Sequence, residues 1–350
     1  MSRLLLEPAA TGALLYLLTR NPSNLRDQFS STTGINETTL RNLIIPLKWL
    51  FSLGLLRRFH NAMTTLAFNN WQFRPQGEPW KFGDDKLSEL VLITGGCSGF
   101  GRLMAKDFSK HARVVILDIQ EPPEDLRVPN IHFYRCDVSD PGAIQSTAVM
   151  IREQHGTVSV LINNAGIARG LTLLESSIEY TEKIFKVNTF AHIYLIKEFL
   201  PAMLEARKGH VVSICSIASY ITLPPILHYC ATKTASNYIS DGLRSELLTR
   251  YPNGNTILTT SVHPTFHDTP MLGDIFGKSS RTSTDMIYPP ENVSRKVVEQ
   301  VLQARSGKLF IPENEYYLSF WKFAPTWLVD LLIFARNKKR LKMLAKAASQ

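Results

Sequence analysis

An alternation of two sequence patterns constrains this chain most. From Leu87 to about Pro312, short apolar runs rich in β-branched residues alternate with longer helical patterns. This alternation is typical of βαβ units, whose helices return the chain to one edge of a parallel sheet. We expect strands at Glu89–Ile93, Arg113–Leu117, Ile131–Arg135, Val158–Ile162, His210–Cys215, Thr256–Val262 and Lys308–Ile311, with the main helical patterns at Ser177–Arg207 and Leu227–Arg250. The sequence therefore predicts an α/β fold, a doubly wound parallel sheet of the Rossmann type.

A glycine-rich segment follows the first expected strand and opens a helix. Gly95, Gly99 and Gly101 are spaced for a tight turn, close approach to a pyrophosphate and close helix packing. A lone glycine-rich loop is weak evidence, but its place inside a βαβ unit makes it stronger. Asp118 ends the next expected strand, where a carboxylate can bind an adenosine ribose and repel a 2′-phosphate. This favours NAD as the cofactor, while Arg102 keeps NADP as the less favoured alternative.

Tyr229 and Lys233 begin the second long helical pattern, four residues apart and therefore on one face. An unperturbed phenol has a pKa of about 10 and is a poor base at neutral pH. A nearby ammonium and an oxidised nicotinamide would stabilise the phenolate; lowering the pKa by about 3 units takes roughly 4 kcal/mol. By itself this spacing is common by chance and equally suits core packing with a surface lysine.

Five motifs occur together along the chain. They are Thr94-Gly95-x-x-x-Gly99-x-Gly101, Asn163-Asn164-Ala165-Gly166, Asn188, Ser216 and Tyr229-x-x-x-Lys233. Their order and approximate spacing resemble the short-chain dehydrogenase/reductase family over about residues 88–312. The resemblance implies an NAD(P)-dependent oxidoreductase that interconverts an alcohol and a carbonyl. The apolar, basic extensions at both ends look most like the membrane-attached retinol and hydroxysteroid dehydrogenases, which implies a lipophilic substrate: a retinoid, a steroid or a long-chain lipid.

The resemblance also implies a role for each motif residue. Tyr229 would exchange the proton, Ser216 would hold the substrate oxygen, and Lys233 would bind the nicotinamide ribose and depress the pKa of Tyr229. Asn188 would hold a water that connects the lysine to solvent. Cofactor contacts are implied for Thr94, Gly95, Ser98, Gly99, Phe100, Gly101, Asp118, Asp137, Asn164, Tyr229, Lys233 and Thr269.

One loop departs from the family pattern. Thr265 follows Pro264 where the family usually shows glycine, although Thr269 still fits a contact to the nicotinamide carboxamide. The backbone path around Phe266 and His267 is therefore harder to predict. His267 can be interpreted as an extra acid or base, but a loop-lining histidine without that duty is the better interpretation.

The positive charge of the chain lies outside the expected catalytic domain. Residues 1–80 hold eight Lys/Arg against four Asp/Glu, residues 313–350 seven against three, and residues 81–312 only 24 against 23. We expect an N-terminal hydrophobic membrane-associating region (1–80), a Rossmann-type dehydrogenase domain (81–312) and an amphipathic basic C-terminal tail (313–350). The near-neutral central region argues against a nucleic-acid partner.

The two tails also carry the longest apolar runs. Leu4–Thr19 and Leu43–Leu56 are each interrupted by a proline and a charged residue, so neither reaches the roughly 18 to 20 apolar residues of a spanning helix. The aromatic stretch Phe320–Phe334 precedes a basic cluster at 336–342, which suits an anionic interface. We expect attachment to an endoplasmic reticulum or lipid-droplet surface, with the catalytic domain in the cytosol. Packing of the tails on the domain or on a second subunit is the alternative.

Other functions are less favoured by the sequence. Four cysteines show no CxxC pair and no metal-ligand grouping with the histidines, so no metal is expected. A catalytically inactive scaffold or binding protein with the same fold is the alternative function, but all four catalytic residues are present. The particular substrate, the direction of reaction and a homodimer stay open.

Overall fold

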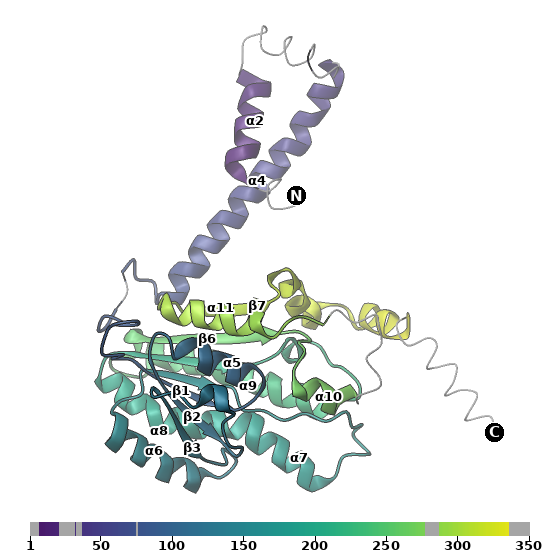
Figure 1. The fold of residues 1–350 in the computed structure, drawn as a ribbon. Coiled ribbons are helices and arrows are strands. Elements are labelled where there is room, and N and C mark those ends of the chain that lie inside the picture. Colours follow the sequence, from purple (N-terminus) through teal and green to yellow (C-terminus); the bar gives the residue numbers. More distant parts are fainter. Residues whose placement is uncertain (1–6, 21–31, 33–36, 75, 277–286, 336–350) are drawn as a thin grey trace, which may run out of the picture. The chain divides into compact units, whose positions relative to one another are not determined.

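The computed structural model describes residues 7–20, 32, 37–74, 76–276 and 287–335. Contacts divide the chain into two compact units, Met1–Arg74 and Pro75–Gln350. The smaller unit is a pair of helices, and the larger unit contains the sheet and its flanking helices (Figure 1).

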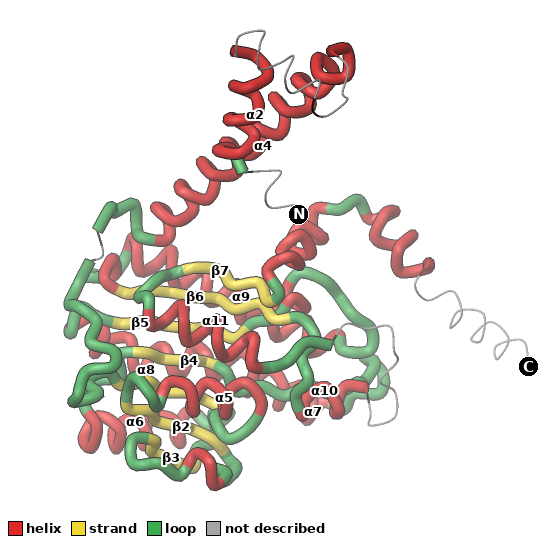
Figure 2. Tube along the Cα trace, turned by 45° about the horizontal axis from the view of Figure 1, so that its top comes forward, coloured by secondary structure: helices red, strands yellow, loops and turns green. Residues whose placement is uncertain are grey.

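Seven parallel strands form one sheet in the order β3-β2-β1-β4-β5-β6-β7 (Figure 2). The strands are β1 (Leu90–Thr94), β2 (Arg113–Asp118), β3 (Ile131–Arg135), β4 (Val160–Asn163), β5 (Gly209–Ile214), β6 (Ile257–Pro264) and β7 (Gly307–Ile311). Their ends lie within two residues of the expected positions, so the predicted strands and the α/β class are confirmed.

Helices cover both faces of this sheet. The α-helices are α5 (Gly99–Phe108), α6 (Pro141–His155), α7 (Ile178–Phe185), α8 (Ala191–Glu205), α9 (Leu227–Thr249), α10 (Pro270–Phe276) and α11 (Glu291–Leu302). Short 3₁₀ segments are η1 (Glu124–Leu126), η3 (Ile217–Ser219), η4 (Gly254–Thr256) and η5 (Glu313–Phe323), and η2 (Lys186–Phe190) is a π-helical turn.

Each strand contributes to two cores because its side chains alternate between the faces. In β1, Leu90 and Leu92 pack with α6, α8 and α9, whereas Val91 and Ile93 pack with α5 and α11. All four side chains are fully buried. Burial on both faces explains why the strands form continuous apolar runs in the sequence.

The strand order creates a place for a ligand. β1 lies between β2 and β4. The sheet extends from β1 through β2 and β3 on one side, and through β4 to β7 on the other. At such a switch point, the carboxyl ends of the parallel strands border an open crevice. The motif residues expected to bind the cofactor follow these strand ends.

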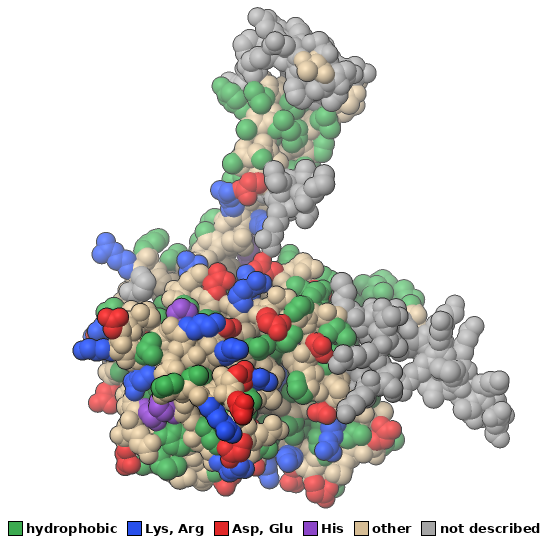
Figure 3. Space-filling view, in the orientation of Figure 1, with side chains coloured by type: hydrophobic (Ala, Val, Ile, Leu, Met, Phe, Trp, Pro, Cys, Tyr) green, Lys and Arg blue, Asp and Glu red, His purple; other side chains and the backbone are tan. Residues whose placement is uncertain are grey.

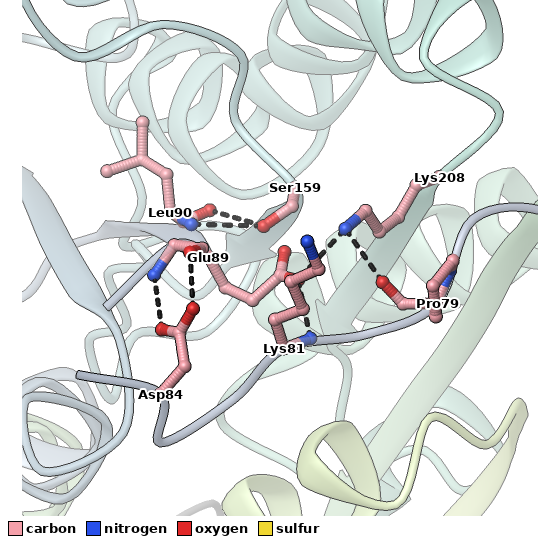
Figure 4. A network of polar contacts seen from close by, with 8 residues as sticks. Pro79, Lys81, Asp84, Glu89, Leu90, Ser159 and Lys208 are labelled. Carbon is pink, nitrogen blue, oxygen red and sulfur yellow. Dashed lines mark hydrogen bonds and ion pairs between the residues drawn. The ribbon is translucent and has the colours of Figure 1, made fainter. Parts of the chain in front are cut away.

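A buried ion pair fixes the segment that precedes β1 (Figure 4). Glu89 is 2% exposed, and its Oε1 accepts hydrogen bonds from the Lys81 amide at 2.8 Å and Lys208 Nζ at 2.9 Å. Lys208 also donates to the Pro79 carbonyl at 3.0 Å and lies 5.7 Å from the Trp80 ring centroid. Because a buried carboxylate is costly without partners, these contacts hold the segment against the domain.

The smaller unit is a helical hairpin formed by α2 (Pro8–Arg20) and α4 (Glu37–Phe68). Leu18 and Leu47 are buried between the two helices. A Cβ at Gly12 would lie 2.9 Å from the Phe51 ring, so the glycine permits close packing there. Arg58 of α4 pairs with Glu7 at the base of α2.

Most large apolar side chains of this hairpin point away from its own core (Figure 3). The exposed ones are Leu14, Tyr16, Leu17, Leu43, Ile45, Trp49, Leu53, Leu55, Leu56 and Phe59. Within the described ranges, none of the helices combines the length and apolarity needed to cross a bilayer.

The C-terminal part of the larger unit also exposes apolar groups. Residues 326–335, after η5, are helical. The exposed side chains include Tyr316, Tyr317, Phe320, Phe323, Trp327, Leu331, Leu332 and Phe334. The basic cluster expected at 336–342 lies outside the described residues.

Candidate active site

The glycine-rich turn between β1 and α5 has the geometry that its spacing predicts. Gly95 has a φ of +66°, in the left-handed region that favours glycine. A Cβ at Gly101 would lie 2.1 Å from the Gly95 carbonyl oxygen and 2.7 Å from Asn164 Nδ2, so only glycine lets α5 begin this close to the turn. Gly99 faces Thr269, whose Cβ is 3.9 Å from the position of an added Cβ.

Thr94 and Asn164 join the ends of β1 and β4. Thr94 Oγ1 accepts hydrogen bonds from the amides of Asn164 and Ala165, both at 3.0 Å. In return, Asn164 Nδ2 donates to the carbonyls of Thr94 at 2.9 Å and Gly95 at 3.1 Å. Thr94 is only 1% exposed and lies behind the turn, so it braces the cofactor crevice without lining it.

Asp118 ends β2 and lines the same crevice. Its Oδ2 accepts from the Cys97 amide at 2.9 Å and its Oδ1 from the Gln120 amide at 3.0 Å. Each carboxylate oxygen keeps lone pairs for a further donor, such as a ribose hydroxyl. Arg102, by contrast, pairs with Asp125 at 2.9 Å and is not among the lining residues.

A cavity of about 390 Å³ brings most of the expected site residues together. Those that line it are Gly95, Ser98, Gly99, Phe100, Asp118, Asp137, Asn164, Ser216, Tyr229, Lys233 and Thr269. Thr94, Gly101 and Asn188 lie behind the lining. The cavity thus joins carboxylates at the ends of β2 and β3 to the tyrosine of α9, as a dinucleotide site of this fold requires.

The chemical groups come from the end of β5 and the first turns of α9. Ser216 Oγ accepts from the Ala218 amide at 3.1 Å and donates to the Pro264 carbonyl at 3.4 Å. Lys233 is 3% exposed, and its Nζ donates to the Ile214 carbonyl at 2.7 Å. Lys233 Nζ lies 5.7 Å from the ring centroid of Tyr229. Helical spacing therefore places the tyrosine and lysine together.

Burial dominates the electrostatics of Tyr229 and Lys233. Burial raises the pKa of Tyr229 to about 12, and a hydrogen bond with Ser216 opposes this rise. Burial also lowers the pKa of Lys233 to about 8. Desolvation, which disfavours the charged form of each group, is the largest cause of both shifts.

Asn188 lies in the π-helical turn between α7 and α8, and such turns often occur at functional sites. Its Oδ1 accepts from the Ile167 amide at 2.8 Å, and its Nδ2 donates to the Ile167 carbonyl at 2.9 Å and to Thr232 Oγ1 at 3.1 Å. Ser236 Oγ donates to the Asn188 carbonyl at 2.7 Å. Asn188 thus ties the loop after β4 to α9, beside Lys233.

The loop after Pro264, which departs from the family pattern, first extends the pairing of β6 with β7 by one hydrogen bond. The Thr265 amide donates to the Ile311 carbonyl at 3.0 Å, and its φ is not positive, so its backbone needs no glycine. His267 is 3% exposed; its Nδ1 donates to the Thr265 carbonyl at 3.1 Å and its ring lies 5.5 Å from that of Phe100. Burial lowers the pKa of His267, which fits a loop-lining role better than acid-base duty.

Two polar contributions to the site were not predicted, because they come from the backbone. The Cys97 amide binds Asp118, and the Ile214 carbonyl holds Lys233. No side-chain pattern could have marked them. Their approximate positions, however, follow from the ends of the adjacent strands.

Comparison with known proteins agrees with this geometry, which defines a Rossmann-type oxidoreductase. The family model described as short chain dehydrogenase matches residues 89–279. The chain belongs to the short-chain dehydrogenase/reductase family, and it is an NAD(P)-dependent oxidoreductase acting on CH–OH groups.

The chain matches curated relatives over about three quarters of their length. Epidermal retinol dehydrogenase 2 of Mus musculus is 35% identical over 244 residues, 67% of this chain and 77% of the relative. Estradiol 17-beta-dehydrogenase 11 of Homo sapiens is 31% identical over 239 residues, 66% of this chain and 77% of the relative.

Solved structures share the fold. A short-chain dehydrogenase/reductase from Burkholderia phymatum in complex with NAD has a TM-score of 0.58 at 23% identity, and the match covers 66% of this chain and 90% of that one. A 3-ketoacyl-(acyl-carrier-protein) reductase from Brucella melitensis with NADH has a TM-score of 0.57 at 22% identity, over 64% and 96% of the two chains.

Proposed function

We propose that this enzyme interconverts a lipophilic alcohol and its carbonyl, with a retinoid, a steroid or a long-chain lipid as substrate. The observation that carries this proposal is the composition of the cavity around Tyr229. Tyr229 belongs to an apolar cluster with Leu223, Ile226 and Ile275. These three residues line the cavity together with Ile167, Ala168, Met271 and Leu272. Such a wall favours an apolar substrate body with one polar group aimed at the catalytic side chains. The names of the curated relatives support the same class.

Four residues have distinct roles in the proposed reaction. In oxidation, Tyr229 accepts the hydroxyl proton while Ser216 holds the oxygen; in reduction, Tyr229 returns the proton. Lys233 is positioned to bind the nicotinamide ribose, and Asn188 holds the adjoining loop. A bound nicotinamide supplies hydride transfer and, when oxidised, a positive charge. That charge would lower the pKa of Tyr229 from the value set by burial.

We infer a preference for NAD over NADP. Asp118 would meet a 2′-phosphate with like charge, and its remaining lone pairs suit ribose hydroxyls. Arg102, the cation that could serve NADP, is held by Asp125. Asp137 and Asn164 line the cofactor cavity, consistent with roles beside the adenine and along the cofactor.

We also propose that the tails attach the enzyme to the cytoplasmic surface of the endoplasmic reticulum or of lipid droplets. The hairpin and the C-terminal segment both expose large apolar and aromatic side chains. Burying such groups in the interfacial region of a bilayer is favourable, and Trp and Tyr are enriched there. Attachment would bring the enzyme near dissolved lipophilic substrate.

Turnover of a substrate panel tests the function. Retinol, estradiol and a long-chain fatty alcohol are offered with NAD or NADP, with glycerol as a polar control. We expect kcat/KM for at least one lipophilic alcohol to exceed that for glycerol by about 100-fold. Preferred turnover of glycerol, or binding of NADH without turnover of any panel member, would reject the proposed substrate class.

A further inference from the structure

The wall of the substrate cavity includes a short helix that was not predicted from the sequence. α10, only seven residues long, spans Pro270–Phe276. Met271, Leu272 and Ile275 of this helix line the cavity together with Ile167 and Ala168 of the loop after β4. The distance of α10 from the loop after β4 therefore sets the space for the substrate body. This inference rests on the proposed function.

The backbone of α10 lies directly against Gly170. The Gly170 amide donates to the Asp274 carbonyl at 3.3 Å. A Cβ at Gly170 would lie 2.0 Å from the carbonyl oxygen of Ile275 and 3.0 Å from its carbonyl carbon. Both obstructing atoms are backbone, so a changed side-chain rotamer cannot relieve the clash. Any residue other than glycine must separate the two segments.

The loop that carries Gly170 is held from the other side. The Arg169 guanidinium lies 5.4 Å from the ring centroid of Tyr180 in α7. Ile167 is bound through both its amide and its carbonyl to the fully buried Asn188. The loop is thus anchored to α7 and to the π-helical turn, and a clash at Gly170 would displace the short α10 instead.

We propose that Gly170 is a specificity-determining position. It sets the width of the substrate cavity, because only glycine lets the backbone of α10 contact the loop after β4. A methyl group there moves α10 outward by about 1.4 Å, the difference between 2.0 Å and ordinary contact at 3.4 Å. The apolar wall then contacts a slender substrate less closely and leaves more room for a bulky one. Displacements of about 1 Å can change rates up to 100-fold.

The chain offers a matched control inside the same helix. Among the described residues outside the backbone of its own helix, a Cβ at Gly273 of α10 would meet no atom within 4 Å. Gly273→Ala therefore makes the same chemical change as Gly170→Ala without the clash. Both variants keep Tyr229, Ser216 and Lys233, so proton transfer is not altered directly.

The test compares the parent enzyme, Gly170→Ala and Gly273→Ala on the fatty alcohol and on estradiol. For Gly170→Ala, we expect KM for the fatty alcohol to rise about tenfold and the estradiol to fatty alcohol ratio of kcat/KM to increase. NADH binding, followed by fluorescence titration, should stay within about twofold of the parent. Gly273→Ala should resemble the parent throughout. Unchanged KM values and an unchanged ratio in Gly170→Ala would overturn the proposal.

A second variant covers the case in which Gly170→Ala does not fold. Ile275→Ala keeps the glycine contact and shortens the same wall, so its substrate ratio should shift towards estradiol as well. If this ratio stays at the parent value, α10 does not set the cavity width. Failure of the parent enzyme to turn over any lipophilic alcohol would instead reject the proposed function, and this inference with it.

Discussion

The two compact units bury apolar side chains in opposite ways. In the catalytic unit, Leu92 and Ile93 of the central strand are 0% exposed between two layers of helices. In the hairpin, Trp49 is 67% exposed and Phe59 64%, and only Leu18 and Leu47 are buried hydrophobic residues among those described there. The catalytic unit forms a core by itself, whereas the hairpin exposes an apolar surface of the kind that marks interaction sites.

One ion pair from each unit shows a similar contrast in burial. Lys208 and Glu89, with side chains 19% and 2% exposed, hold a segment of the catalytic unit in place. Arg58 and Glu7 of the hairpin are 62% and 43% exposed. The catalytic unit thus buries one ion pair, alongside exposed pairs such as Arg135–Glu121, whereas the pair of the hairpin lies on its surface. This difference fits the proposed division between a catalytic unit and an attachment unit.

The largest effect is expected at Tyr229. Tyr229→Phe removes the proton-transfer group and should lower kcat by about 10² to 10⁴-fold. NADH affinity should change little, because the ring remains. Tyr238→Phe is the control, since Tyr238 is on the same helix and 78% exposed. More than one tenth of parental turnover in Tyr229→Phe would remove the tyrosine from the mechanism.

The next largest effect is expected when the buried and the exposed ion pair are each broken. Lys208→Ala leaves the Glu89 carboxylate buried without its cation and should reduce the free energy of unfolding by about 3 kcal/mol. Arg58→Ala should cost at most about 1 kcal/mol, because that pair is exposed. Urea unfolding followed by circular dichroism checks both variants. Equal losses would show that burial does not distinguish the two units.

The exposed face of the hairpin should govern membrane binding. Leu53→Glu and Leu56→Glu, introduced together, should weaken binding to phosphatidylserine-containing vesicles by about 100-fold, since burying two leucines contributes at least about 3 kcal/mol. Leu174→Glu is the control, because Leu174 is 97% exposed on the catalytic unit. A comparable loss in the control would mean that the hairpin has no special role.

The smallest effect concerns the cofactor. Asp118→Ala removes the ribose partner and the repulsion of a 2′-phosphate, and should narrow the preference for NAD by about tenfold. The ratio of kcat/KM values for the two cofactors measures this change. A parent enzyme that already prefers NADP would contradict the role assigned to the carboxylate.

The sequence predicted those parts of the fold and site that depend on local patterns. Strands buried on both faces form continuous apolar runs, and helical spacing places Tyr229 beside Lys233. Contacts between distant residues left no such pattern: Glu89 and Lys208 are 119 positions apart, and Gly170 is a lone glycine in a loop. The extent to which burial raises the pKa of Tyr229 also left no pattern in the sequence, because burial depends on the whole fold.

The most direct test of the division between the units measures retinol oxidation in two media, phosphatidylserine-containing vesicles and detergent micelles. Three full-length proteins are compared: the parent, Tyr229→Phe, and the Leu53→Glu and Leu56→Glu double variant. Our account predicts that Tyr229→Phe is inactive in both media. The hairpin variant should lose turnover only with vesicles and keep parental kcat/KM in micelles. Equal loss in both media for the hairpin variant, or retained turnover in Tyr229→Phe, would contradict it.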